Sequence, residues 1–347
     1  MPSVGFVSLQ HVGSRVLVAM AAVLLLGQAA PVHAQSKADG FGPFPVRNFQ
    51  PFQLIFLGMF GDRATVLEKR ALDLRVELAE TSSAFIQNSQ QINATLKFET
   101  LRAGLFFRYG LTDRLEVGLE VPVLYRYSGF LEGAITAVER MTTGLSPVRQ
   151  RLEDTSYVFD FSRNGTPLFD GGNGDVGIGD ITFIGKYQVL LEGDHIPALA
   201  VRFAVKAPTG DPNRAFGSGH PDLGLGLAAE KAIARNWLLY VNVNGIFPTG
   251  SVAGFSLGPA FSSITAVEYL WSPNLSLVAQ FDYYSSPYRD TGANLLDRGV
   301  TETAFGFNYR LRQHLLWQVY GVENLDFTTD SAADFTLSTL ITFRFRK

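Results

Sequence analysis

The sequence predicts an all-β protein, a closed antiparallel transmembrane β-barrel of about twelve strands. Three observations predict it: an apolar N-terminal leader, segments in which apolar and polar residues alternate, and connections that are short and long in turn. The composition fits, because 46% apolar and 18% charged residues exclude disorder, and a formal charge of −3 gives no footprint for nucleic acid. The chain has no cysteine, which excludes disulfides, thiolate metal sites and cysteine nucleophiles.

The first 34 residues have the features of a secretory signal peptide. Arg15 is the only charged residue before Lys37, an apolar run covers residues 16–27, and small residues precede Ala34. We therefore expect a signal peptide over residues 1–34, cleaved near Ala34. A spanning helix needs roughly 20 apolar residues, more than this run offers. If the mature protein enters a bilayer, it must do so as strands.

Residues 35–71 form an N-terminal segment ahead of the alternating region. It carries Phe49, Phe52, Leu54, Phe56 and Leu57, which make it apolar enough to require burial. Two places are open to it, the periplasmic floor of the barrel or the lumen, where it would act as a plug.

Residues 72–347 are predicted to form the barrel. In the first strand Leu72, Leu74, Val76 and Leu78 share one face, and the residues between them are Asp73, Arg75 and Glu77. Strands are expected at 72–80, 95–109, 115–127, 176–190, 197–208, 221–231, 236–247, 255–270, 274–284, 301–310, 315–325 and 335–345. In the second strand polar residues change parity near Thr100 to Arg102, which predicts a β-bulge there.

The connections distinguish a membrane barrel from a soluble β-sandwich. Five are short, near 110–114, 193–195, 232–235, 271–274 and 311–314, and they alternate with long ones at 128–175, 209–220, 248–254, 285–300 and 326–334. Short periplasmic turns and long external loops are typical of outer-membrane barrels. Aromatic residues near strand ends suit a headgroup belt: Tyr109, Tyr125, Tyr127, Trp237, Trp271, Tyr283 and Trp317. Because lipid offers no partner to backbone groups, the first and last strands should pair, with both termini in the periplasm.

The connection 128–175 is much longer than most loops, which indicates a functional role. Residues 134–141 fit a short helix, and Tyr157, Phe159 and Phe161 alternate like part of a hairpin. Whether this loop folds into the mouth as a constriction or caps it from outside is left open.

Several stretches resemble known families. Residues Gly42–Asn48 with Pro51–Leu57, and Gly129–Ile135 followed by Gly144 and by Arg149 or Arg151, resemble the Gram-negative family called domain of unknown function 3187. Residues Tyr109–Val117 and Gly174–Asp180 are similar to outer-membrane proteins of the phenol-degradation (MetA-pathway) family. Both resemblances imply an outer-membrane fold, and neither implies an activity or a functional residue. The ending 343–347 resembles the strand that such barrels present to the barrel-assembly machinery, although Arg346 and Lys347 follow Phe345.

Three motifs could carry chemistry, but each is interpreted as a polar loop. Residues 172–177 fit G-x-G-x-x-G, but a strand follows where a dinucleotide site needs a helix. Asp170, Asn173 and Asp175 could place oxygens around Ca²⁺, although a polar turn is the simpler interpretation. Ser218, His220 and Asp222 suggest a rim hydrolase only if the histidine accepts the serine proton. His195 and His314 lie elsewhere, so we expect no metal site, no cofactor and no catalytic residue.

Alternate residues of a strand share one face, so the charged residues on the polar face of each strand are expected to line the lumen. The candidate lumen-lining residues are Arg75, Arg108, Glu116, Glu120, Arg126, Asp180, Lys186, Arg202, Lys206, Glu268, Asp282, Glu302, Arg310 and Arg344. The two signs nearly balance, which does not indicate a strongly ion-selective pore. These charges either pair between strands and fill a modest bore or orient a polar solute across a passage.

The sequence therefore predicts a monomeric barrel in the outer membrane of a Gram-negative bacterium, a passive channel or transporter for a small solute. Loop 128–175 and segment 40–71 would restrict the pore. A lumen-sealed structural or adhesive barrel and, remotely, a phospholipase-like rim hydrolase are the alternatives. Expected partners are outer-membrane lipid and lipopolysaccharide, the assembly machinery, and a small solute, with no nucleic acid.

Overall fold

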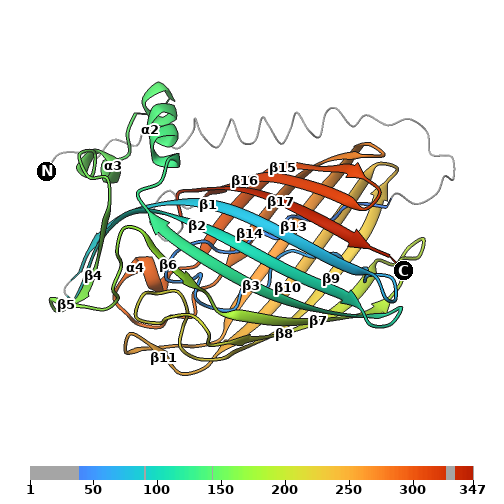
Figure 1. Ribbon diagram of the computed structural model, residues 1–347, viewed down its shortest axis with the longest axis horizontal. Helices are drawn as coiled ribbons and strands as arrows, with labels where there is room; N and C mark the ends of the chain where they lie inside the picture. The colour runs from blue at the N-terminus through green and yellow to red at the C-terminus, as the bar shows by residue number, and fades with distance from the viewer. Residues whose placement is uncertain (1–38, 90, 143, 326–332, 347) are drawn as a thin grey trace, which may run out of the picture. The chain divides into compact units, whose positions relative to one another are not determined.

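The computed structural model describes residues 39–89, 91–142, 144–325 and 333–346. Within these residues, twelve antiparallel strands form a closed ring, in the order β1, β2, β3, β7, β8, β9, β10, β13, β14, β15, β16 and β17 (Figure 1). The predicted closed antiparallel barrel is thus confirmed. The predicted signal peptide lies outside the described residues. No helix in the described part of the chain is both long and apolar enough to cross a membrane.

The ring strands follow most of the predicted segments, but the predicted strand 176–190 is interrupted at residues 179–180 and the predicted strand 255–270 enters the ring only from residue 260. They are β1 (Leu72–Asn88), β2 (Ile92–Gly110), β3 (Leu115–Tyr127), β7 (Ile181–Leu190), β8 (Ala198–Ala207), β9 (Asp222–Ala234), β10 (Trp237–Pro248), β13 (Ala260–Ser272), β14 (Leu275–Tyr284), β15 (Val300–Arg312), β16 (Leu315–Asn324) and β17 (Phe335–Phe345). The remaining elements belong to the long connections: α2 (Leu131–Thr142), α3 (Pro147–Arg151), β4 (Val158–Arg163), β5 (Thr166–Pro167), β6 (Asp175–Ile178), β11 (Ser251–Val252), β12 (Phe255–Ser256) and α4 (Asn294–Asp297).

First and last strands close the ring. β1 pairs with β17 from Leu72 opposite Phe345 to Ser82 opposite Phe335. Along every strand the side chains alternate between the two faces of the wall. Leu225 and Leu227 on the outer face of β9 are each 59% exposed, whereas Asp222 and Glu268 on the inner face are fully buried. The ring therefore presents apolar side chains outward and encloses its charges, the reverse of a soluble barrel.

The β-bulge expected near Thr100 to Arg102 is wrong. β2 pairs with β1 and with β3 in one unbroken register through this stretch. The change of parity instead marks a change of surroundings along a regular strand. Further along β2, Leu96 and Phe98 point inward into an apolar cluster, while Lys97 and Glu99 point outward and are covered by the loop 128–175. Polarity switches faces because the strand continues beyond the apolar outer surface.

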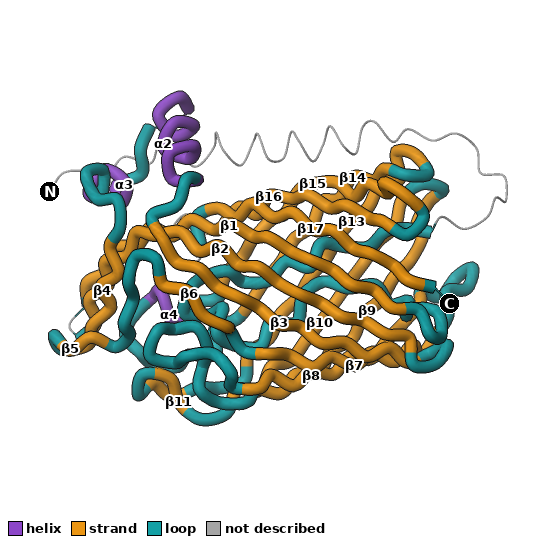
Figure 2. The backbone as a smooth tube through the Cα atoms, viewed as in Figure 1, coloured by secondary structure: helices purple, strands orange, loops and turns teal. Residues whose placement is uncertain are grey.

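The long connections gather at one end of the ring (Figure 2). β4 continues the sheet by pairing with the end of β2, and β6 does the same with β3. The predicted hairpin is formed by β4 and β5, and the predicted short helix is α2. Phe161 and Phe169 of this loop stack on Phe52, with ring centroids 4.5 and 5.1 Å apart. An aromatic cluster thus covers the mouth of the ring at this end.

Candidate functional site

Residues 39–71, here called the plug, run inside the ring as irregular backbone. Burial of Phe44, Val46 and Phe52 is complete. Because backbone N–H and C=O groups without partners are costly to bury, an irregular segment needs partners from the wall. Inward side chains supply them. Gln280 of β14 accepts from Phe44 N at 2.9 Å and donates to Phe44 O at 3.1 Å. Asn242 of β10 binds Asp62 in the same two-sided way, at 2.9 and 3.0 Å.

Charged wall residues bind the plug backbone as well. Glu268 accepts from Phe41 N and Gly42 N at 3.0 and 3.2 Å. The same kind of contact is made by Asp222 to Leu57 N (2.9 Å), Glu116 to Leu67 N (2.8 Å), Arg202 to Phe60 O (2.9 Å) and Lys206 to Ile55 O (2.9 Å). These predicted lumen residues therefore act as hydrogen-bonding partners of the plug.

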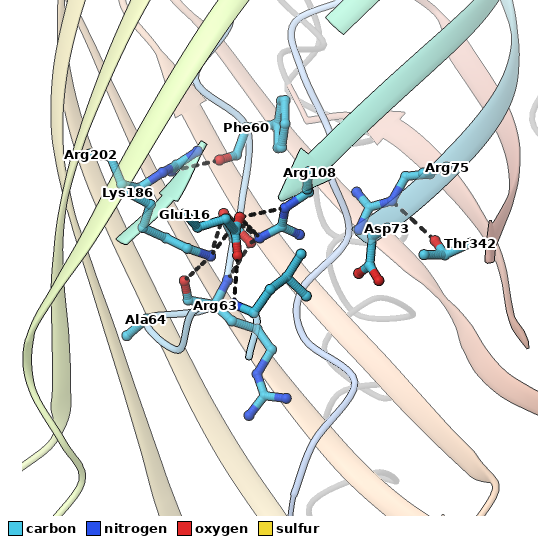
Figure 3. A network of polar contacts seen from close by, with 12 residues as sticks. Phe60, Arg63, Ala64, Asp73, Arg75, Arg108, Glu116, Lys186, Arg202 and Thr342 are labelled. Atoms are coloured by element: carbon cyan, nitrogen blue, oxygen red, sulfur yellow. Dashed lines mark hydrogen bonds and ion pairs between the residues drawn. The ribbon is translucent and has the colours of Figure 1, made fainter. Parts of the chain in front are cut away.

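An ionic cluster surrounds Asp62 of the plug. Arg108 of β2 and Lys186 of β7 contact its carboxylate at 3.2 and 3.0 Å, and Glu116 of β3 lies 2.5 Å from Arg108. Figure 3 shows Arg108, Glu116 and Lys186 converging from three strands on this part of the plug. Burial alone would raise the pKa of Asp62, but the charges of Arg108, Lys186 and Arg202 outweigh it and hold that pKa below its ordinary value. Asp62 is thus a carboxylate fixed among cations.

Arg63, next in the chain, binds a different strand of the wall. Its guanidinium contacts Glu230 of β9 at 2.5 Å and Asp39 at 3.0 Å. Burial would lower the pKa of Arg63, but the Glu230 carboxylate more than offsets this and raises it. Adjacent plug residues of opposite sign therefore find complementary charges on different strands.

Two further clusters join inward charges. Lys206 of β8 lies 2.5 Å from Asp180 and 3.2 Å from Asp222. Glu120 of β3 pairs with Arg102 of β2 and, at 2.8 Å, with Arg47 of the plug. Arg102 also pairs with Glu77 of β1. These contacts support the pairing explanation for the balanced charges over a free ionic lining.

The other predicted lumen residues have different surroundings. Asp282 of β14 lies directly opposite Glu302 of β15, both are buried, and the described residues include no ion pair to either. Elsewhere Arg75 donates to Thr342 at 3.2 Å, Arg310 lies 4.6 Å from the ring of Phe41, and Arg126 stacks on Phe98, Phe159 and Phe216. Arg344 pairs with Asp73 at 2.8 Å, with its side chain 41% exposed at the end of the ring.

Space remains on both sides of the plug near residues 54–58. One small cavity of about 50 Å³ extends toward β10, β13 and β14 and is lined by Ile246, Ala260 and Tyr284. A second of about 30 Å³ extends toward β3, β7 and β8 and is lined by Glu120, Thr182 and Lys206. Arg47, Leu54, Phe56 and Gly58 line both. The plug thus obstructs the lumen at this level without filling it.

Glycines on the inner face of β9 make room for the plug. A Cβ on Gly224 would lie 2.6 Å from Met59 Sδ and 2.7 Å from Leu57 Cδ2, and one on Gly226 would lie 2.2 Å from Asn244 Oδ1. The Leu–Gly alternation of this strand was visible in the sequence. It reflects the close approach of the plug side chains Leu57 and Met59 to the wall, which could not be inferred from the alternation alone.

The prediction of inward side chains from the alternation along strands missed several residues of the site. Asp62, Arg63 and Arg47 belong to the plug, which has no periodicity from which their direction could be read. Asn242, Gln280 and Asn308 are uncharged, so a search for charges passed over them. The available signal was an amide side chain on the inner face of a strand, a position that suits a backbone partner.

The alternative motifs find no chemical role among the described residues. Ser218 Oγ donates to the backbone carbonyl of His220 at 3.0 Å, and no described contact joins it to the imidazole. Asp175 Oδ2 accepts from Gly172 N at 2.7 Å, the geometry of a polar turn. Across the described ranges no cluster of three or more histidine or acidic residues could hold a metal ion.

Solved structures with similar folds are outer-membrane channels. The COG4313 outer membrane channel from Pseudomonas putida F1 matches with a TM-score of 0.56 at 15% identity, over 81% of this chain and 98% of that one. A NanC porin matches with a TM-score of 0.45 at 10% identity (78% and 98% of the chains), and the P. putida toluene transporter TodX with 0.38 at 10% (81% and 91%). No curated protein matches the chain. At these identities the likeness concerns the fold.

The family itself is settled by sequence. The model of the family described as "Protein of unknown function (DUF3187)" matches residues 17–345, which confirms the resemblance seen in the motifs, whereas the phenol-degradation likeness stays a prediction. The chain belongs to the DUF3187 family and folds as a twelve-stranded barrel of the kind found in outer-membrane channels.

Proposed function

We propose that this protein is a passive outer-membrane channel of a Gram-negative envelope, exported by a signal peptide cleaved near Ala34, through which a small polar solute passes when the plug shifts. One observation carries the proposal: hydrogen bonds and ion pairs join the plug to the wall beside its buried apolar side chains, and small cavities lie on both sides of it. Water can replace these polar contacts when the plug shifts. An obstruction held in this way suits a gated passage.

The second candidate is a barrel sealed by the plug for a structural or adhesive role. The number of wall contacts made by the plug and the aromatic cluster around Phe52 favour it. The two candidates differ in one measurable property, since only a channel conducts.

Planar-bilayer recordings test the proposal. The unaltered protein should show small conductance steps, and the double variant Asn242→Ala with Gln280→Ala, which removes two two-sided contacts to the plug, should show larger or longer openings. A variant lacking residues 39–60 should conduct most. Asp154→Ala, at an exposed position of the outer loop, is the control. If no variant conducts although each is shown to be folded, the channel is contradicted and the sealed barrel is supported.

A further inference from the structure

The first turn of the loop helix α2 contacts the outside of the barrel wall at the limit of its apolar surface, and the rest of the helix extends away from the barrel (Figure 1). On the outer face of β1 the last exposed apolar residue is Leu78, at 45%, and the next outward residues, Glu80 and Ser82, are buried. Ser82 donates to Glu132 of α2 at 3.3 Å. On β2 the outward carboxylate of Glu99 accepts the backbone N–H groups of residues 130–132, at 2.7–3.0 Å, and so caps the helix.

Ion pairs fasten the polar face of α2 to the protein, and Lys97 of β2 makes one of them with Glu132 at 3.5 Å. Arg149 of α3 contacts Glu132 at 3.2 Å, Glu139 at 2.6 Å and Asp334 at 2.9 Å. Its pKa is raised because these carboxylates outweigh the burial that would lower it. Figure 1 shows α3 on the side of α2 that faces away from the middle of the barrel. The face of α2 opposite Glu132 and Glu139 therefore points back toward the wall's apolar surface.

That opposite face is apolar and has no cover among the described residues. Phe130, Ala134, Ala137, Val138 and Met141 follow an i, i+4, i+7, i+8, i+11 spacing, which places them on one side of a helix. Phe130 is 64%, Val138 56% and Met141 77% exposed. Outward Tyr125 and Tyr127 of β3, which stack 4.8 Å apart, come just before this stripe in the chain. The chain therefore passes from the apolar outer surface of β3 directly into the stripe.

We propose that α2 is an interfacial helix that lies in the headgroup region of the outer leaflet, with this apolar stripe inserted among the lipid chains. Figure 1 shows its axis running across the strand direction, as expected for a helix parallel to the membrane plane. The proposal rests on the proposed membrane location of the barrel and adds a second lipid contact outside the wall. Lipid is the occupant because the stripe faces the same side as the surface that the membrane covers.

Single-cysteine variants test this directly, because the chain has no cysteine of its own. Nitroxide labels are placed at Val138→Cys and Met141→Cys. Leu225→Cys on the outer face of the barrel is the control for a lipid-exposed label, and the exposed Asp154→Cys is the control for a water-exposed label. In phosphatidylcholine vesicles the labels at 138 and 141 should collide more with oxygen than with an aqueous nickel chelate, as at 225, and the label at 154 should do the reverse. Reaction with a membrane-impermeant maleimide should be roughly tenfold slower at 138 than at 154.

The outcomes separate the two proposals. Labels at 138 and 141 that behave like 154, while 225 is in lipid, overturn the interfacial helix and leave the barrel's location intact. An aqueous signal at 225 as well contradicts the membrane location itself. Protection at 138 that rises with the protein-to-lipid ratio indicates a second copy and also overturns the lipid assignment.

Discussion

Asp62 shows how one residue can join the plug to the wall. Its carboxylate meets Arg108 and Lys186 from separate strands, while its backbone binds Asn242. Removing one partner of a buried ion pair leaves the other charges uncompensated, which costs more than the pair contributes. The effect of substitution at Asp62 should therefore far exceed that at exposed carboxylates.

Replacing Asp62 by asparagine should destabilise the protein by about 3 kcal/mol, because Arg108 and Lys186 stay buried and must then share Glu116 as their counter-charge. Urea unfolding of the protein in phospholipid vesicles measures this. The matched control is Asp39→Asn, which removes a carboxylate that is 79% exposed and paired with Arg63, and should cost at most about 1 kcal/mol. Equal losses for the two variants would contradict the assigned role.

Asp334, just before β17, gives the outer loops a pH dependence. Burial raises its pKa from 3.8 to about 7, although Arg149 lowers it in part. The folded protein therefore binds an extra proton between these pH values, so this group's contribution to stability falls as the pH rises from about 4 to about 7. Asp334→Asn should remove this slope and be more stable than the unaltered protein at pH 8. Unfolding measured across pH 4–8 checks it, and an unchanged slope would rule it out.

At the scale of elements, β9 is a strand against which the plug packs closely. Its inner face carries Gly224 and Gly226 opposite Met59 and Asn244. Gly224→Val should push the plug from the wall, since overpacking costs roughly 1–3 kcal/mol, and should increase conductance if the protein is a channel. Gly245→Val in β10 is the control, because a Cβ there comes no closer than 3.4 Å to Phe247. Identical behaviour of the two variants would show that β9 does not seat the plug.

Element prediction succeeded where the alternation was continuous. β3 and β17 begin and end at the predicted residues because their two faces meet lipid-like and polar surroundings along the full length. β1 is longer than predicted, since residues 81–88 lie beyond the apolar surface and lose the pattern. The same reason explains the false β-bulge in β2.

The candidate site was predictable only on its wall side. Parity placed Arg108, Glu116 and Lys186 on the inner face, where the structure has them. It could not say that they bind Asp62, because the plug is irregular and its direction leaves no periodic trace in the sequence. The sequence showed that positive and negative charges in the lumen nearly balance. It did not show the cause, which is that wall charges pair through the plug.

For the molecule as a whole, the apolar outer surface is its most testable property. Leu225 lies on that surface with 59% exposure. Leu225→Arg should destabilise the barrel in phospholipid vesicles by about 2–4 kcal/mol, since a charge on the lipid face is costly near the bilayer midplane. Asp154→Arg in the outer loop is the control and should have little effect. A negligible loss at position 225, measured by urea unfolding, would argue against a lipid-facing wall.

The pairing of β1 with β17 has a consequence for biogenesis. The plug precedes β1 in the chain, and the ring becomes complete only when the final strand meets the first. If the closed circle formed early, the N-terminal residues would have to thread through one end against the ordered aromatic cover. A simpler sequence of events is that they settle on the inner faces of β9 and β10 while the seam is still open. Enclosure would then be the last step, and the buried polar contacts would help to shape the cylinder that surrounds them.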